Sequence, residues 1–203
     1  SRVRTFSRSA AAFASFVCVA PVVAAEDSPY IQLKEGAEWT MDAKLMSPKA
    51  GVLPAVGRRV IESGVEKDGK KYLRERTWLE VKGEKVTGYS KLVRKDPAGF
   101  YSIQEDQEGA TEQCEIVLPL KAGQSWEFLS KGKTMKCTVI GLETVTVGDK
   151  TYENCFHLRT AEAGGAFTED FWESPNEGNV KSELVFGNGG KLTVTLKEFK
   201  PGK

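Results

Sequence analysis

Nucleophilic and acid–base catalysis requires residue types that are scarce in this 203-residue chain. The chain contains a single histidine, His157, which stands between Phe156 and Leu158 in an alternating apolar and polar segment. A serine or cysteine hydrolase needs a nucleophile, a base and an oxyanion site. The segment 88–92, Gly-Tyr-Ser-Lys-Leu, lacks the closing glycine of a nucleophile elbow. We therefore predict a surface histidine, no catalytic residue and no enzymatic activity.

The cysteines and acidic residues do not form a metal-binding pattern. Cys114, Cys137 and Cys155 are widely separated, whereas zinc ligands usually come in closely spaced pairs. The segment 106–109, Asp-Gln-Glu-Gly, has an incomplete alternation of calcium ligands and is interpreted as a polar loop. We expect no metal and no cofactor. Three separate thiols are the expectation; if an oxidising location does form one disulfide, Cys114–Cys137 is the predicted pair.

An aromatic and acidic cluster surrounds Trp172, which is flanked by Asp170, Phe171 and Glu173. Glycosidase chemistry needs two carboxylates at a set separation, and the sequence does not show which acids converge. The large apolar ring of Trp172 could instead stack on a ligand, and a sugar is one hypothesis. The alternative interpretation places Trp172 in a structural strand.

Short strands must position these residues, because apolar side chains alternate with polar ones along much of the chain. Segments 39–45, 155–159 and 192–197 show this period of two, which places one face on a core and the other in water. Glycine-containing turn signals lie between such runs, at 68–69, 131–132, 148–149, 176–178 and 188–190. The pattern predicts an all-β fold with a predominantly antiparallel curved sheet, which forms a sandwich or an open barrel.

An internal repeat divides this fold into two similar halves. Residues 33–39 and 120–126 share the pattern L-K-x-G-x-x-W. We predict one domain over residues 26–203, made of halves near 30–110 and 111–203. Each half alone would leave open sheet edges, so the two are expected to pair.

The polar stretch 105–112 is the predicted crossing point between the halves. In each copy of the repeat, the glycine can supply a positive φ before a strand. Trp39 and Trp126 end the two copies and could be ligand-stacking platforms or apolar wedges at equivalent strand starts. The repetition itself favours the structural interpretation.

The first 25 residues predict export. Arg2, Arg4 and Arg8 are their only charges, an apolar run covers 10–20, and small residues precede Glu26. This order is typical of a cleavable signal peptide, and it predicts a periplasmic or extracellular protein. An organelle transit peptide and a lipoprotein signal with Cys18 as the modified residue are the alternatives. The apolar run is about half of the ~20 residues that span a bilayer, so no transmembrane segment is expected.

The charge of the remaining chain argues against nucleic-acid binding. Three of the 29 basic residues and none of the 28 acidic residues lie in the first 25 positions, so the rest has a net charge of −2. A nucleic-acid-binding domain needs a basic surface, which this balance does not provide.

Three motifs follow one another in the second half: P-L-K-x-G-x-x-W at 119–126, Y-x-N-C at 152–155 after a V-T-V run, and W-x-x-P-x-x-G-x-V-K at 172–181. This order resembles a broad group of uncharacterised secreted bacterial β-rich domains of unknown function. A Pro-Ala-Gly turn of that group is replaced here by residues 148–150. The resemblance implies export and a β-rich fold but no activity. The group is distantly similar to curved-sheet envelope proteins, some of which carry lipids.

Three functional hypotheses result. The first is an exported, non-enzymatic envelope protein that binds an unknown partner or contributes structurally. The second is a carrier of an apolar or lipid ligand inside a curved sheet, and the third is a carbohydrate-binding module. Hydrophobic residues make up 40% of the chain, an ordinary share that does not separate them. A carrier predicts a lined cavity, whereas a structural module predicts a filled core.

Overall fold

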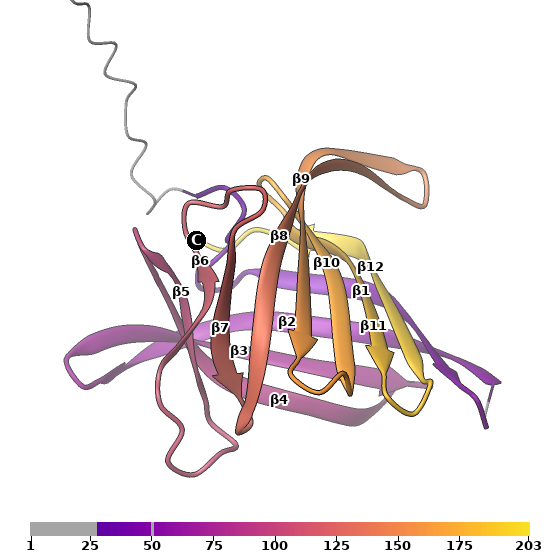
Figure 1. The fold of residues 1–203 in the computed structure, drawn as a ribbon, viewed down its shortest axis with the longest axis horizontal. Helices are drawn as coiled ribbons and strands as arrows, with labels where there is room; N and C mark the ends of the chain where they lie inside the picture. Colours follow the sequence, from indigo (N-terminus) through magenta and orange to yellow (C-terminus); the bar gives the residue numbers. More distant parts are fainter. Residues whose placement is uncertain (1–27, 50) are drawn as a thin grey trace, which may run out of the picture.

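The computed structural model describes residues 28–49 and 51–203, and within them every regular element is a β-strand (Figure 1). The predicted signal peptide, residues 1–25, lies outside these ranges. The strands are β1 (Glu38–Ser47), β2 (Gly51–Lys67), β3 (Lys70–Val81), β4 (Glu84–Asp96), β5 (Gly99–Gln104), β6 (Gln113–Val117), β7 (Ser125–Ser130), β8 (Lys133–Val147), β9 (Lys150–Glu162), β10 (Phe167–Ser174), β11 (Gly178–Phe186) and β12 (Lys191–Lys200). The predicted all-β class is confirmed. No helix in the described ranges has the length and apolar character needed to cross a membrane.

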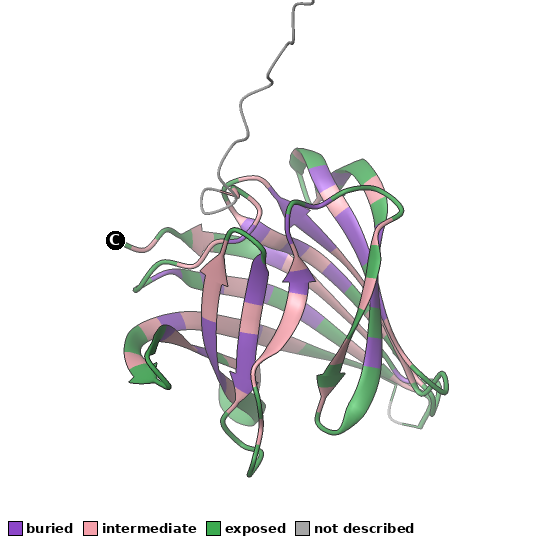
Figure 2. Ribbon diagram, turned by 60° about the vertical axis from the view of Figure 1, so that its left-hand side comes forward, coloured by how far each residue is buried: buried purple, intermediate pink, exposed green. Residues whose placement is uncertain are grey.

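All twelve strands belong to one antiparallel sheet in the order β6-β5-β4-β3-β2-β1-β12-β11-β10-β9-β8-β7. Strands β1–β6 and β7–β12 therefore form two meanders, which join where β1 pairs with β12. Strong curvature folds the sheet into a nearly closed barrel, in which β1–β4 cross behind β7–β12 (Figure 1). Burial alternates along the strands, as the period of two requires (Figure 2).

The two edge strands, β6 and β7, meet at a seam that side chains bridge. The indole Nε1 of Trp126 donates to the carbonyl of Glu115 over 2.9 Å. The backbone N–H of Leu129 donates to Oε1 of Gln113 over 3.1 Å. These bonds occupy groups that an open edge would leave free for aggregation, and they help to hold the barrel closed.

Both copies of the repeated motif form the same turn before the first strand of a meander. Gly36 and Gly123 have positive φ values of 82° and 80°. Their N–H groups donate to the carbonyls of Ile61 and Val139, each over 2.8 Å, and both acceptor residues donate back across the turn. The glycine is required because this backbone conformation strains residues that carry a Cβ.

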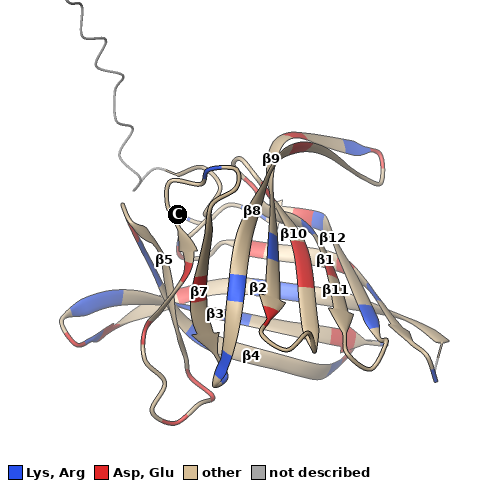
Figure 3. Ribbon diagram, viewed as in Figure 1, with Lys and Arg blue, Asp and Glu red and all other residues tan. Residues whose placement is uncertain are grey.

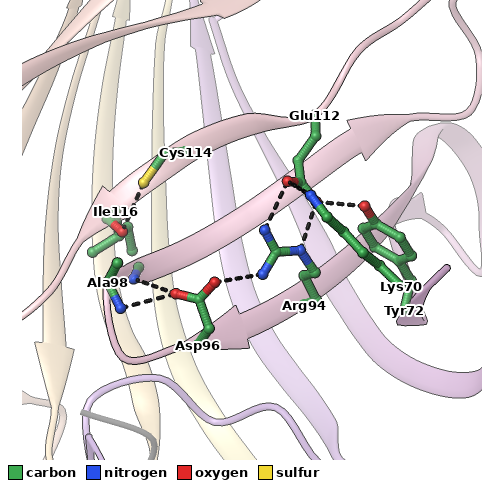
Figure 4. A network of polar contacts seen from close by, with 9 residues as sticks. Lys70, Tyr72, Arg94, Asp96, Ala98, Glu112, Cys114 and Ile116 are labelled. Atoms are coloured by element: carbon green, nitrogen blue, oxygen red, sulfur yellow. Dashed lines mark hydrogen bonds and ion pairs between the residues drawn. The ribbon is translucent and has the colours of Figure 1, made fainter. Parts of the chain in front are cut away.

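The polar stretch 105–112 lies within the first meander, as the loop between β5 and β6, and residues 118–124 connect the two meanders. A polar network holds the loop on the outer face of the sheet (Figure 4). Glu112 accepts hydrogen bonds from Arg94 at 2.6 and 2.7 Å and from Lys70 at 2.8 Å. The hydrogen bonds from Arg94 outweigh partial burial and lower the pKa of Glu112 to about 2.

The apolar core draws on both meanders and on the segment before β1. Ile31 packs in one cluster with Val93 and Leu158, while Trp39 packs in a second cluster with Val180. Burying side chains of this kind stabilises the fold by roughly 1.5–3 kcal/mol each. The core thus fixes the curvature of the sheet and the interior on which the site depends.

Candidate functional site

A cavity of about 510 Å³ lies inside the barrel and extends from Trp39 in the core to Lys131 in the exposed β7–β8 turn. Both meanders line it. Its aromatic lining consists of Trp39, Trp78, Tyr89, Phe100, Phe128, Phe167 and Phe171. Aliphatic side chains of β11 and β12 continue this surface, because register places Leu184 directly opposite Leu192. The interior is therefore a mainly apolar chamber.

Charged side chains cross one wall of the chamber, where β2–β4 and β6 lie. The guanidinium of Arg59 forms an ion pair with Glu75 at 2.7 Å. Lys91, directly opposite Glu75 in the β3–β4 ladder, contacts Glu75 at 3.5 Å and Glu115 at 2.8 Å. Burial opposes ionisation of Glu75, but Arg59 and Lys91 outweigh it and hold its pKa below the usual value. The four groups form a continuous, mutually neutralising network.

Strand β10 places two further carboxylates in the chamber. Glu169, Phe171 and Glu173 occupy every second position of β10 and all line the chamber, so acidic residues interrupt its apolar lining. Figure 3 marks acidic positions of β10 in red. Neither carboxylate forms an ion pair with a lysine or arginine in the described part of the chain. Glu173 is 8% exposed, and its Oε1 accepts a hydrogen bond from Asn179 over 3.4 Å. Burial raises the pKa of both Glu169 and Glu173 to about 7.

These raised pKa values predict a pH dependence of stability. The folded protein binds more protons than the unfolded chain between about pH 4.5 and about pH 7, so the free energy of unfolding falls as pH rises through this window. The double variant Glu169→Gln/Glu173→Gln should lose this pH dependence. Its free energy of unfolding at pH 8 should exceed that of the wild type by about 1–3 kcal/mol. Urea denaturation at pH 5 and pH 8 measures the free energy of unfolding of each protein. Glu127→Gln/Glu198→Gln, at exposed positions, is the control; equal pH dependence in all three proteins would contradict the prediction.

His157 lies on the outer face of the sheet, away from the chamber. Its Nδ1 is 2.8 Å from Glu143 and its Nε2 is 2.7 Å from Asp170. The prediction of a surface histidine is wrong: His157 is buried, at 9% exposure, because Trp172 stacks on its ring at 4.5 Å. With both ring nitrogens bonded to carboxylates, the imidazole is held as a structural link between β8 and β10.

Trp172, the predicted ligand contact, is 8% exposed and stacks on His157. Its Nε1 donates to Glu143 over 2.9 Å, and Nζ of Lys181 lies 4.6 Å from the ring centroid. A sugar could stack on this ring after His157 or Lys181 moved aside. The carbohydrate-stacking role stays a prediction, and it concerns a place distinct from the chamber.

Cys114, Cys137 and Cys155 are separate free thiols. A β-bulge at Phe100/Tyr101 shifts the register of β6, and Cys114 pairs with Tyr101, while Cys137 pairs with Trp126 in the buried core. Burial raises the pKa of Cys137 and Cys155 to about 11, which makes both thiols poor nucleophiles. The Cys114–Cys137 disulfide stays a prediction for the exported protein. Across the described ranges, no group of three or more His, Cys, Asp and Glu side chains is arranged to hold a metal ion.

No protein-family model and no curated protein matches the chain. Among solved structures, the chain is similar to a Bacteroides fragilis protein with a YmcC-like fold, which is provisionally described as exported. The two share 12% identity over 84% of this chain and 98% of that one, with a TM-score of 0.52. A provisionally described lipoprotein from Parabacteroides distasonis shares 14% identity over 84% and 98% of the two chains, with a TM-score of 0.51. A β-barrel-like domain of unknown function from Brucella abortus shares 11% identity over the same fractions, with a TM-score of 0.42.

At these identities the likeness establishes the fold alone. The chain shares the fold of the Bacteroides fragilis and Parabacteroides distasonis proteins, which agrees with the coarse resemblance seen in the sequence. The words "exported" and "lipoprotein" describe those two proteins, and they agree with the predicted location of this one.

Proposed function

We propose that the protein is an exported, non-enzymatic carrier that holds the apolar part of a lipid-like ligand in the chamber of its barrel. The observation that supports this best is the chamber of about 510 Å³, lined mainly by aromatic and aliphatic side chains. Ligand sites of about 300–1,000 Å³ with such a lining are typical of small-molecule binding. Each buried methylene of a ligand contributes about 0.8 kcal/mol.

The chamber favours the carrier over a purely structural module. Protein interiors are close-packed, with few voids larger than a water molecule. An interior serving structure alone gains dispersion energy when it is filled. Here Phe128, Phe167 and Leu184 line open space in place of a filled core. The signal-like first 25 residues support export, and an envelope location would bring the protein close to lipids.

The proposal predicts that filling the chamber abolishes binding of an apolar probe. N-phenyl-1-naphthylamine, a neutral apolar fluorophore, should bind the wild type with enhanced fluorescence. Leu184→Trp places a bulky ring in the chamber, and we expect at least about a tenfold loss of affinity, equivalent to about 1.4 kcal/mol. Leu184 lines the chamber and faces Leu192, which makes it a suitable site for the block.

The matched control is Val185→Trp, one residue along β11, where the side chain faces outward and is 44% exposed. This variant should bind the probe like the wild type, and urea denaturation verifies that both variants are folded. Lipid extraction followed by mass spectrometry of freshly exported protein supplies a second measurement. No probe binding by the wild type, or the same affinity in the two variants, would refute the carrier.

A further inference from the structure

Carboxylates outnumber cationic groups on the wall of the chamber. In the described part of the chain the charged lining residues are Arg59, Lys91 and Lys131 against Glu75, Glu115, Glu169 and Glu173. This excess inside a barrel is unusual, because a buried charge without a partner is costly. The pairing of these groups decides which of them are free to meet a ligand.

Each cation of the wall already has an acidic partner. Arg59 pairs with Glu75 at 2.7 Å, and Lys91 pairs with Glu115 at 2.8 Å. Lys131 pairs at 3.1 Å with an aspartate of the β5–β6 loop, outside the chamber. The uncompensated negative charge is therefore confined to the remaining two carboxylates, those of β10.

Glu169 and Glu173 lie on one face of β10 with the ring of Phe171 between them. Their polar contacts are neutral: Asn179 donates to Glu173 over 3.4 Å, and the hydroxyl of Ser182 bonds to Glu169. An aromatic face flanked by carboxylates attracts a cation through both charge and ring quadrupole. Sulfate, phosphate and carboxylate heads would be repelled at the same place.

A third acceptor faces the chamber from the opposite meander. The side-chain oxygen Oε1 of Gln104, at the end of β5, is buried and has no hydrogen-bond partner, and Gln104 lines the chamber. A buried acceptor of this kind costs about 1–3 kcal/mol unless a donor reaches it. The two carboxylates and Gln104 thus share one requirement, which is a ligand that donates hydrogen bonds or carries positive charge.

We propose that the ligand carries an ammonium group, which lies against the face of β10 that bears Glu169 and Glu173, and an apolar chain, which fills the aromatic part of the chamber. This inference rests on the carrier function proposed above and names the class of its ligand, a cationic amphiphile. Attraction to the carboxylates of β10 offsets the desolvation of the ammonium group, and the chain supplies the apolar contacts.

Titration of the two carboxylates gives the proposal a pH signature. The charged groups that act on them are Arg59, Glu75, Lys91, Glu115 and Asp170. Since Glu169 and Glu173 ionise near pH 7, they are anionic at pH 8 and largely protonated at pH 5. Affinity for a cationic head should therefore weaken as the pH falls from 8 to 5, while affinity for a neutral head stays constant.

The test compares three amphiphiles with the same twelve-carbon chain, each below its micelle concentration: dodecyltrimethylammonium, dodecyl sulfate and octaethylene glycol monododecyl ether. Affinities are measured by displacement of N-phenyl-1-naphthylamine at pH 8 and pH 5. At pH 8 we expect the wild type to bind dodecyltrimethylammonium at least about tenfold more tightly than either of the other amphiphiles, a difference of about 1.4 kcal/mol. Glu169→Gln/Glu173→Gln should lose the preference and still bind the neutral amphiphile.

Glu127→Gln/Glu198→Gln, which removes two exposed carboxylates, should keep the preference. Glu169→Gln alone provides a second variant in case the double variant does not fold, and it should reduce the preference. Equal wild-type affinity for the three heads, or an undiminished preference in the Glu→Gln variants, overturns the cationic ligand while leaving the carrier intact. If the probe and all three amphiphiles fail to bind, both proposals fall.

Discussion

Replacing Glu75 by alanine should lower the free energy of unfolding by about 3–5 kcal/mol, as expected when one partner of a buried ion network is removed. The Glu75 side chain is 3% exposed and contacts both Arg59 and Lys91. Its loss leaves the Arg59 guanidinium without its 2.7 Å partner in the wall of the chamber. Lys91 retains Glu115, so the main cost falls on Arg59.

Glu62→Ala is the matched control for this variant, because it removes a carboxylate from the neighbouring strand β2. Glu62 pairs with Arg76 at 3.1 Å, but both side chains are substantially exposed, so the pair is worth at most about 1 kcal/mol. Urea denaturation at pH 7 measures the free energy of unfolding of both variants. A loss in Glu75→Ala no greater than that in Glu62→Ala would show that the chamber network does not stabilise the fold.

Truncating Trp39 to alanine should cost about 3–5 kcal/mol, the range expected for a buried tryptophan. Trp39 is 1% exposed, and its Nε1 donates to the carbonyl of Glu177 over 2.7 Å. Arg59 stacks over the ring at 4.3 Å and Phe199 packs at 5.0 Å. The variant therefore loses apolar burial, a hydrogen bond and the support of the charged wall together.

Trp78→Ala tests whether a tryptophan that lines the chamber without being deeply buried matters less. The Trp78 ring is partly exposed and donates to Glu80 on its own strand, so we expect a loss near 1 kcal/mol. Chemical denaturation of both variants gives the comparison. If Trp39→Ala keeps wild-type stability and loses only probe binding, then Trp39 is a ligand platform and the structural interpretation of the repeat is wrong.

Much of the fold could be predicted because strand formation depends on neighbouring residues. The alternation in 39–45 and 192–197 corresponds to β1 and β12, which pair at the centre of the sheet. The repeated glycines, Gly36 and Gly123, adopt the positive φ that their motif suggested. The crossing point was misplaced, because a polar run such as 105–112 is equally suited to a hairpin loop.

The candidate site could not be predicted in the same way. A local signal did exist, since Glu169 and Glu173 share the phase of Phe167 and Phe171 and so belong to the inward face. Trp172 takes the opposite phase, does not line the chamber, and is buried in the same core cluster as Val180. The partner carboxylates and cations come from β2, β3, β4 and β6, strands that the sequence does not place opposite β10.

The amino-acid sequence by itself determined the all-β class, the antiparallel pattern and the two matching turns, because these follow from side-chain alternation and backbone conformation over a few residues. Only the tertiary structure decided that the interior holds a chamber and that Glu169 and Glu173 lack cationic partners there. Both depend on how far the sheet curves before β6 meets β7, and that curvature is set by packing across the whole barrel.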